Sequence, residues 1–133
     1  MPVGTIGKYE RLDILGHGTS GVVYLAWDTL LRRNVALKEI RADAPDTDRI
    51  VQEARLLDKL RGHPHIVEVH SVDLIGTTLL IDMELVKGET LAAYLKNAPS
   101  NRLEPAEAVR VAVAVLEALN HAHTRRIVHK DVK

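Results

Sequence analysis

The sequence lacks several features that would have pointed to particular classes of protein. None of its 133 residues is a cysteine, which excludes a disulfide framework and a cysteine-based zinc or iron–sulfur site. Neither sign of charge predominates, because 18 Lys and Arg balance 18 Asp and Glu; this argues against a general binder of nucleic acid or of membrane surfaces. No apolar run approaches the roughly 20 residues that cross a bilayer, and the first residues lack the pattern of a secretory signal. We therefore expect a cytoplasmic chain without a membrane segment.

The sequence does contain enough apolar residues, 46%, to form a packed core. Its length suggests about one domain, taking roughly 100–200 residues per domain. Period-two patterns, turn residues and apolar residues at helical spacing indicate the order of elements. The expected strands are 9–15, 22–27, 35–40, 66–75, 78–85 and a short one at 127–129, and the expected helices are 49–61, 90–97 and 106–123.

The expected helix 106–123 is apolar nearly all round, with one stripe through Val109, Val113 and Leu116. Such a helix is normally enclosed by other elements, yet little chain follows it. It is either an alanine-rich helix packed on the sheet, an oligomer interface, or a helix whose cover belongs to a larger domain. We favour the last of these, with the chain forming the front part of that domain.

A cluster of glycines, Gly16, Gly18 and Gly21, runs into the strand-like residues 22–25. Glycines allow a backbone to turn tightly and bring its N–H groups close to phosphates. Because a strand rather than a helix follows, a hairpin covering a nucleotide fits better than a dinucleotide-binding turn. A purely structural glycine hairpin is the alternative.

Further motifs follow the glycines in a fixed order along the chain. They are Gly16-x-Gly18-x-x-Gly21-x-Val23, Val35-Ala36-Leu37-Lys38, a helix with Glu53, the segment His63-Pro64-His65-Ile66-Val67, the stretch Leu79 to Gly88, and His129-Lys130-Asp131-Val132-Lys133. This ordered set resembles the signatures of eukaryotic-like serine/threonine protein kinases of the bacterial type. The resemblance extends from Tyr9 to Lys133.

The resemblance places Lys38 against the phosphates of ATP and makes Glu53 its carboxylate partner. A buried lysine needs such a partner, and Glu53 lies one helical turn from Ile50 and Leu57, on the expected apolar face. The alternatives are a solvated lysine at a strand edge and an ordinary surface acid.

The resemblance also implies residues around the adenine and at the site of phosphoryl transfer. Leu15, Val23 and Ala36 would enclose the adenine, Met83 would be the gatekeeper, and backbone groups of Glu84 and Val86 would bind its edge. Asp131 would be the catalytic base, and Lys133 completes the D-x-K pattern of serine/threonine kinases. The alternatives are ordinary strand core for the first group and a basic tail for the last residues.

Two departures from the family concern control and metal binding. Lys130 stands where the family commonly has arginine, and lysine cannot form the same bidentate pair with a phosphorylated loop. The family's Mg²⁺ ligands, an asparagine later in the catalytic loop and the aspartate of Asp-Phe-Gly, follow the point in that loop at which this sequence ends. We expect Mg²⁺ for the complete domain but no metal site here, because the histidine pairs His63/His65 and His121/His123 lack further ligands.

The expected fold is α+β and protein-kinase-like, with a five-stranded antiparallel sheet and one helix in residues 1–86. Residues 87–133 would form the first helices of an incomplete helical lobe. The expected function is ATP-dependent phosphoryl transfer to protein serine or threonine, with the chain inactive alone. Its protein substrate is not indicated, and an oligomer or the rest of the lobe would cover residues 106–123. The alternative is a non-catalytic nucleotide-binding or docking module that regulates a partner.

Overall fold

The computed structural model describes residues 3–18, 21–43, 47–130 and 132. They form two compact units, one from residues 1–62 and 67–86 and the other from 63–66 and 87–133. The strands are β1 (Gly4–Ile6), β2 (Tyr9–Gly18), β3 (Gly21–Asp28), β4 (Arg33–Arg41), β5 (Val69–Ile75) and β6 (Thr78–Met83). The helices are α1 (Thr47–Asp58), α2 (Leu91–Asn97), the 3₁₀ turn η1 (Pro99–Asn101) and α3 (Pro105–Thr124).

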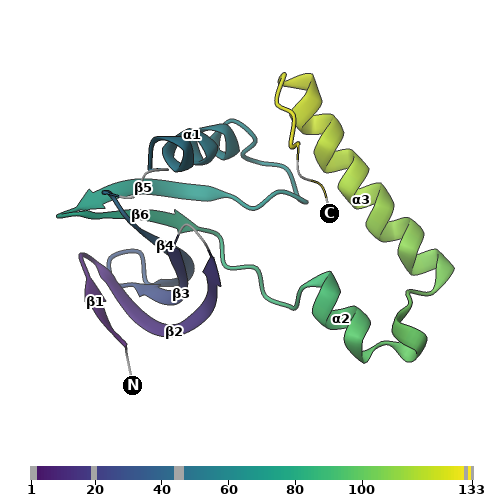
Figure 1. The fold of residues 1–133 in the computed structure, drawn as a ribbon, viewed down its shortest axis with the longest axis horizontal. Coiled ribbons are helices and arrows are strands. Elements are labelled where there is room, and N and C mark those ends of the chain that lie inside the picture. Colours follow the sequence, from purple (N-terminus) through teal and green to yellow (C-terminus); the bar gives the residue numbers. More distant parts are fainter. Residues whose placement is uncertain (1–2, 19–20, 44–46, 131, 133) are drawn as a thin grey trace. The chain divides into compact units, whose positions relative to one another are not determined.

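The first unit is a curled antiparallel sheet with α1 beside it (Figure 1). The order of strands is β1-β2-β3-β4-β6-β5, and every neighbouring pair is antiparallel. The sheet therefore has six strands in the described residues, one more than the five expected. The additional strand, β1, pairs with the start of β2, where Val3 N–H donates to the Arg11 carbonyl.

Successive side chains of a strand point to opposite sides, and the central strands β4 and β6 bury apolar side chains on both faces. On the face toward α1, Ile40 and Ile81 pack with Ile50 and Ala54 of the helix. On the other face of the sheet, five buried strand residues form a second core. Its members are Tyr9, Ala26, Val35, Leu37 and Leu80.

A buried carboxylate fixes the turn between β3 and β4. Asp28 is fully buried, and its Oδ1 accepts the N–H groups of Leu30 and Leu31 at 3.0 and 2.9 Å. Lys8 Nζ lies 2.8 Å from its Oδ2. Burial alone would raise the pKa of Asp28, but Lys8 and the two backbone amides outweigh it and hold the pKa below its ordinary value of 3.8. The same ion pair raises the pKa of Lys8.

A second buried carboxylate lies in β6, on the face away from α1. The Tyr9 hydroxyl donates to Asp82 Oδ2 at 2.9 Å, and His70 Nδ1 lies 2.9 Å from Oδ1. Burial and the hydrogen bond to this carboxylate raise the pKa of Tyr9. The network satisfies a polar group in the second core, as a buried charge requires.

The second unit contains α2, η1 and α3 together with residues 63–66. Thr90 caps α2 by accepting the Ala93 N–H at 3.1 Å, and the Tyr94 hydroxyl donates to Glu107 of α3 at 2.8 Å. The only buried residue of α3 is Ala122, and much of the helix's apolar surface is exposed. No helix in the described part of the chain is long and apolar enough to cross a bilayer.

The α+β architecture is confirmed, but several predicted boundaries are wrong. Residues 127–129 form no strand, and Arg126 just before them has a positive φ of 60° that turns the chain. β5 begins at Val69 rather than at Ile66: the Ile66 N–H donates to the His63 carbonyl in a turn, and the first residue that pairs with β6 is Val69. α1 begins at Thr47, two residues before the predicted start, and ends at Asp58, three residues before the predicted end.

Candidate functional site

Two glycines of the β2–β3 hairpin differ in whether the fold requires them. Gly21 has a φ of 148°, and a Cβ there would overlap the Glu39 carbonyl oxygen of β4. The fold itself therefore demands glycine at position 21. At Gly16 a Cβ would meet no atom within 4 Å and the φ is ordinary, so the fold makes no such demand. Gly16 instead leaves a bare backbone surface that a ligand can approach closely.

Strand register brings several of the predicted site residues to one face of the sheet. Gly16 pairs with Val23, and Val23 pairs with Lys38. Ala36, two residues before Lys38 on the same strand, pairs with Met83. Cross-strand partners and residues two apart share a face, so these five residues lie on the side of the sheet against which α1 packs.

Lys38 is half-buried on this apolar face, between Ala36 and the core residue Ile40. Within the described residues it makes no ion pair. An ammonium group in apolar surroundings is stabilised by a nearby anion, so the site is electrostatically suited to a phosphate.

The predicted position of Glu53 on the core-facing side of α1 is wrong. Its side chain is 61% exposed, and its Oε1 lies 3.9 Å from Arg49 Nε rather than beside Lys38. The buried residues of α1 are Ile50 and Ala54. At 3.6 residues per turn, Glu53 lies about 80° from the centre of the stripe that these two define. The glutamate is thus at the margin of the stripe, where its flexible side chain reaches solvent.

The segment after β6 is held by backbone and side-chain bonds to residue 68. Glu84 N–H donates to the Glu68 carbonyl at 2.8 Å, and the Glu68 N–H donates to Glu84 Oε2 at 3.2 Å. Val86, two residues further along the chain, is 67% exposed, and Leu15 on the glycine hairpin is 50% exposed. These bonds fix the backbone at Glu84, directly after the end of β6.

Comparisons with known proteins identify the family of the chain. The family model of the protein kinase domain matches residues 9–133. The chain is 36% identical over 132 residues to serine/threonine-protein kinase PrkC of Bacillus subtilis, covering 96% of this chain and 20% of that protein. It is 39% identical over 132 residues to PknF of Mycobacterium tuberculosis, covering 97% and 28%, and 35% identical over 133 residues to CBL-interacting protein kinase 4 of Oryza sativa, covering 96% and 29%.

The chain belongs to the protein kinase family. It spans between a fifth and just under a third of the length of these curated kinases. The kinase resemblance inferred from the motifs is thereby confirmed, and with it the kinase-like α+β fold.

Two of the predicted kinase residues, Asp131 and Lys133, lie outside the residues that the structure describes. Gly18 belongs to the described part of the hairpin and pairs with Gly21. The candidate site residues that the structure does describe therefore lie on the glycine hairpin outside residues 19–20, on one face of β3, β4 and β6, and in the segment 84–86.

Three of the seven histidines of the kinase chain, His63, His65 and His121, form a packing cluster. The rings of His63 and His121 lie 4.7 Å apart, those of His63 and His65 lie 5.7 Å apart, and His65 Nε2 is 3.5 Å from Glu117. Across the described ranges, no three His, Asp or Glu side chains are grouped so that they could hold a metal ion. This cluster joins residues 63–66 to α3 within the second unit.

Sequence reasoning gave no role to Asp82, although a signal for it existed. An acid in the run Thr78–Met83, whose other inner members are all apolar, is the unusual feature of a strand buried on both faces. The partners of Asp82, Tyr9 and His70, could not be found in this way because they lie 73 and 12 residues away.

Proposed function

We propose that this chain forms the nucleotide-binding part of a serine/threonine protein kinase domain. In the protein to which it belongs, the γ-phosphoryl group of ATP would pass to a serine or threonine hydroxyl of a protein. The observation that carries the proposal is the strand register, which sets Lys38 among Val23, Ala36 and Met83 beneath a hairpin with a bare Gly16. The names of the related kinases support the Ser/Thr class.

The residues on this face suit the two chemically different halves of ATP. The triphosphate would meet the ammonium of Lys38 and the backbone N–H groups around Gly16, Gly18 and Gly21. The adenine would lie among Leu15, Val23, Ala36 and Met83, with backbone groups of Glu84 and Val86 at its edge. ATP supplies the phosphoryl group, and these residues bind and orient it.

The proposed partner of Lys38 remains Glu53, in an arrangement that differs from the one described. The Arg49–Glu53 pair joins two side chains that are 67% and 61% exposed. Such surface pairs contribute about 0–1 kcal/mol, so little free energy holds Glu53 away from Lys38.

We further propose that Asp131 orients the substrate hydroxyl as catalytic base and that Lys133 assists at the transferred phosphoryl group. Residues 1–86 and 87–133 would correspond to the two lobes of a kinase domain. No step is assigned to Mg²⁺, because the described residues provide no group of ligands for it.

Binding of a fluorescent ATP analogue to the chain tests the nucleotide site. Lys38→Met should weaken binding about tenfold or more, because a hydrogen bond between charged groups is lost. Lys96→Met is the matched control, since Lys96 is an exposed lysine of α2 in the other unit. Equal affinity of the wild type and Lys38→Met would show that the nucleotide site is misassigned.

One observation favours the alternative of a non-catalytic nucleotide-binding module. Glu53 contacts Arg49 and not Lys38, so the ammonium has no protein carboxylate beside it in the described arrangement. The chain would then bind ATP without transferring phosphate. Because the chain is expected to be inactive alone, the test uses the protein to which it belongs, incubated with radiolabelled ATP and a generic protein acceptor. Label in protein that is lost in Asp131→Asn supports the kinase, whereas ATP binding without labelling supports the module.

A further inference from the structure

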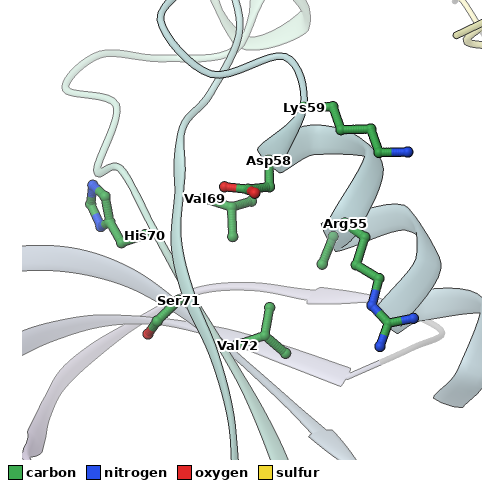
Figure 2. Close-up of a pocket in the computed structure, with 8 residues that line it drawn as sticks. Arg55, Asp58, Lys59, Val69, His70, Ser71 and Val72 are labelled. Atoms are coloured by element: carbon green, nitrogen blue, oxygen red, sulfur yellow. The ribbon is translucent and has the colours of Figure 1, made fainter.

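His70 is the extra residue of a bulge in β5. Val69 pairs with Met83 and Ser71 pairs with Asp82, so His70 has no partner in the strand register. A bulge of this kind turns a side chain in a direction that a regular strand does not give it. Figure 2 shows the His70 ring on the side of β5 away from α1. There it reaches Asp82, on the face of the sheet opposite the proposed nucleotide site.

The contact with Asp82 decides which nitrogen of the ring carries the hydrogen. His70 Nδ1 lies 2.9 Å from Asp82 Oδ1, and the other carboxylate oxygen accepts the Tyr9 hydroxyl at 2.9 Å. A carboxylate can only accept hydrogen bonds, so the hydrogen of the neutral ring is on Nδ1. Nε2 therefore carries the lone pair, which makes it the nucleophilic atom of the ring.

This nucleophilic nitrogen is open to a reagent. The side chain of His70 is 19% exposed. Within the part of the chain that is described, its Nε2 makes no hydrogen bond and is not closed off from solvent. A carboxylate bound to Nδ1 orients the ring and raises the basicity of the other nitrogen. A nucleophile activated in this way by a neighbouring group is typical of covalent chemistry.

A single nitrogen suits covalent chemistry better than metal binding. Metal sites usually combine three or four protein ligands, and no three His, Asp or Glu side chains of the described ranges are grouped in that way. One lone pair is enough, however, to form a bond to an electrophilic carbon. The chain has no cysteine, whose thiolate would compete for such a carbon.

The charges around His70 favour a neutral electrophile over an anionic one. Asp82 faces the ring, and Asp73 lies three residues further along the same strand. Arg61 binds the carbonyl of the residue before His70, but its guanidinium already faces two carboxylates. These acids repel an anionic reagent, whereas they stabilise the positive charge that the ring gains when Nε2 is alkylated.

We propose that His70 is a covalent modification site for neutral α,β-unsaturated carbonyl compounds. The Nε2 lone pair attacks the β-carbon and forms an N–C bond, while the electrons of the C=C π bond move to give an enolate. The enolate takes a proton from water. The ring, alkylated at Nε2 and still protonated at Nδ1, carries one positive charge that faces the Asp82 carboxylate. No leaving group is released, and no oxidant or reductant is consumed.

Limited reaction of the whole chain with acrolein, followed by borohydride reduction and mass spectrometry of peptides, measures the rate at each histidine. His17 is the internal comparison, because it is an exposed histidine of β2 with no carboxylate partner among the described residues. His70 should react about tenfold faster than His17 or more, although its ring is less exposed. Equal rates, or a faster reaction at His17, would overturn the proposal.

Two variants separate the effect of the carboxylate from that of the fold. Asp82→Asn keeps the shape of the side chain but removes its charge, and it should bring the rate at His70 down to that at His17. Tyr9→Phe is the control, because it removes a hydrogen bond from the same carboxylate without touching the ring, and His70 should still react faster than His17. A preference for His70 that survives Asp82→Asn, or that is lost in folded Tyr9→Phe, would contradict the role of the carboxylate.

Phosphoramidate, an anionic reagent that phosphorylates histidine, tests the charge of the electrophile. The preference for His70 over His17 should disappear with this reagent, and an equally strong preference would refute the assignment to neutral compounds. Circular dichroism checks that each variant is folded, and the ratio of the two rates in the wild type decides the matter if Asp82→Asn is not. Lys38→Met should leave this ratio unchanged, so failure of the nucleotide site and failure of the modification site give different results.

Discussion

Gly16 and Gly21 belong to one motif in the sequence, yet the structure separates their roles. Gly21 combines a φ of 148° with a backbone oxygen where its Cβ would stand, whereas Gly16 has neither constraint. The conservation of a motif in a family does not reveal which of its glycines serves the fold; the space around each one does.

Alanine substitutions at these two positions should affect different properties, stability at Gly21 and ATP binding at Gly16. Gly21→Ala should lower the free energy of unfolding by at least about 2 kcal/mol, because it adds backbone strain and displaces β4. Gly16→Ala should change stability by less than about 0.5 kcal/mol but weaken ATP binding. Urea unfolding and nucleotide titration of both variants measure this. Similar losses of stability in both would contradict the distinction.

The buried carboxylate of Asp28 gives the fold a defined dependence on pH. Because its pKa is lower in the folded than in the unfolded chain, its contribution is present above about pH 4 and is lost as the pH falls through the folded pKa. Asp28→Asn should reduce stability at pH 7 by about 1–2 kcal/mol, since the Lys8 pair is lost while the amide oxygen can still accept two N–H groups.

Thermal melts between pH 2.5 and 7 check this prediction. The wild type should lose part of its stability advantage over Asp28→Asn below pH 4. Asp43→Asn is the control, because Asp43 pairs with Arg41 only on the exposed surface. An unchanged difference in melting temperature between wild type and Asp28→Asn across this range would refute the role given to the carboxylate.

At the scale of elements, long patterned segments could be predicted and marginal ones could not. The strands around β3, β4 and β6 and the helix α3 follow from period-two and helical spacing over six residues or more. β1 has three residues, too few to show a period, and depends on pairing with β2. Ile127 and Val128 favour a strand locally, but no neighbouring strand pairs with them among the described residues.

The wrong prediction for the Glu53 side chain also shows what a local sequence pattern leaves open. Spacing from Ile50 and Leu57 places a residue near the apolar face, but it does not fix the direction of a long, flexible side chain at the margin of that face. Register could be anticipated only in part, since the bulges in β2 between residues 11 and 13 and between 14 and 16 leave no mark in the sequence.

The exposed apolar stripe of α3 leads to a prediction about association. Val109, Val113 and Leu116 are 61%, 47% and 63% exposed and lie on one side of the helix. Val109→Glu with Leu116→Glu should reduce self-association of the chain and change its melting temperature little, because neither side chain is buried. Sedimentation velocity at several concentrations measures this.

Ala122→Glu is the contrasting variant, because Ala122 is the buried residue of α3. It should destabilise the helix without reducing association. If the variant with both Val109→Glu and Leu116→Glu associates as strongly as the wild type, the apolar stripe of α3 does not mediate self-association.

At the scale of the whole molecule, the two units differ in how much apolar surface they bury. The first unit has two cores, one on each face of β4 and β6. In the second unit, α2 has no buried residue and α3 has one. Local stability follows buried apolar contacts, so the chain should not open as one cooperative unit.

Amide hydrogen exchange should show this difference. The amides of β4 and β6 should exchange slowest, and those of α2 should exchange fastest among the described helices and strands. Mass spectrometry of peptic fragments provides the measurement. Equal protection of α2 and β4 would indicate that the chain folds as a single cooperative body.

The burial of β4 on both faces gives Lys38 a practical use as a reporter. Its side chain is only half-buried, so an acylating reagent should reach the amine without local unfolding of the strand, which we expect to open least. A triphosphate seated against the amine would shield it, and the rate of acylation at this one lysine would then measure nucleotide occupancy directly.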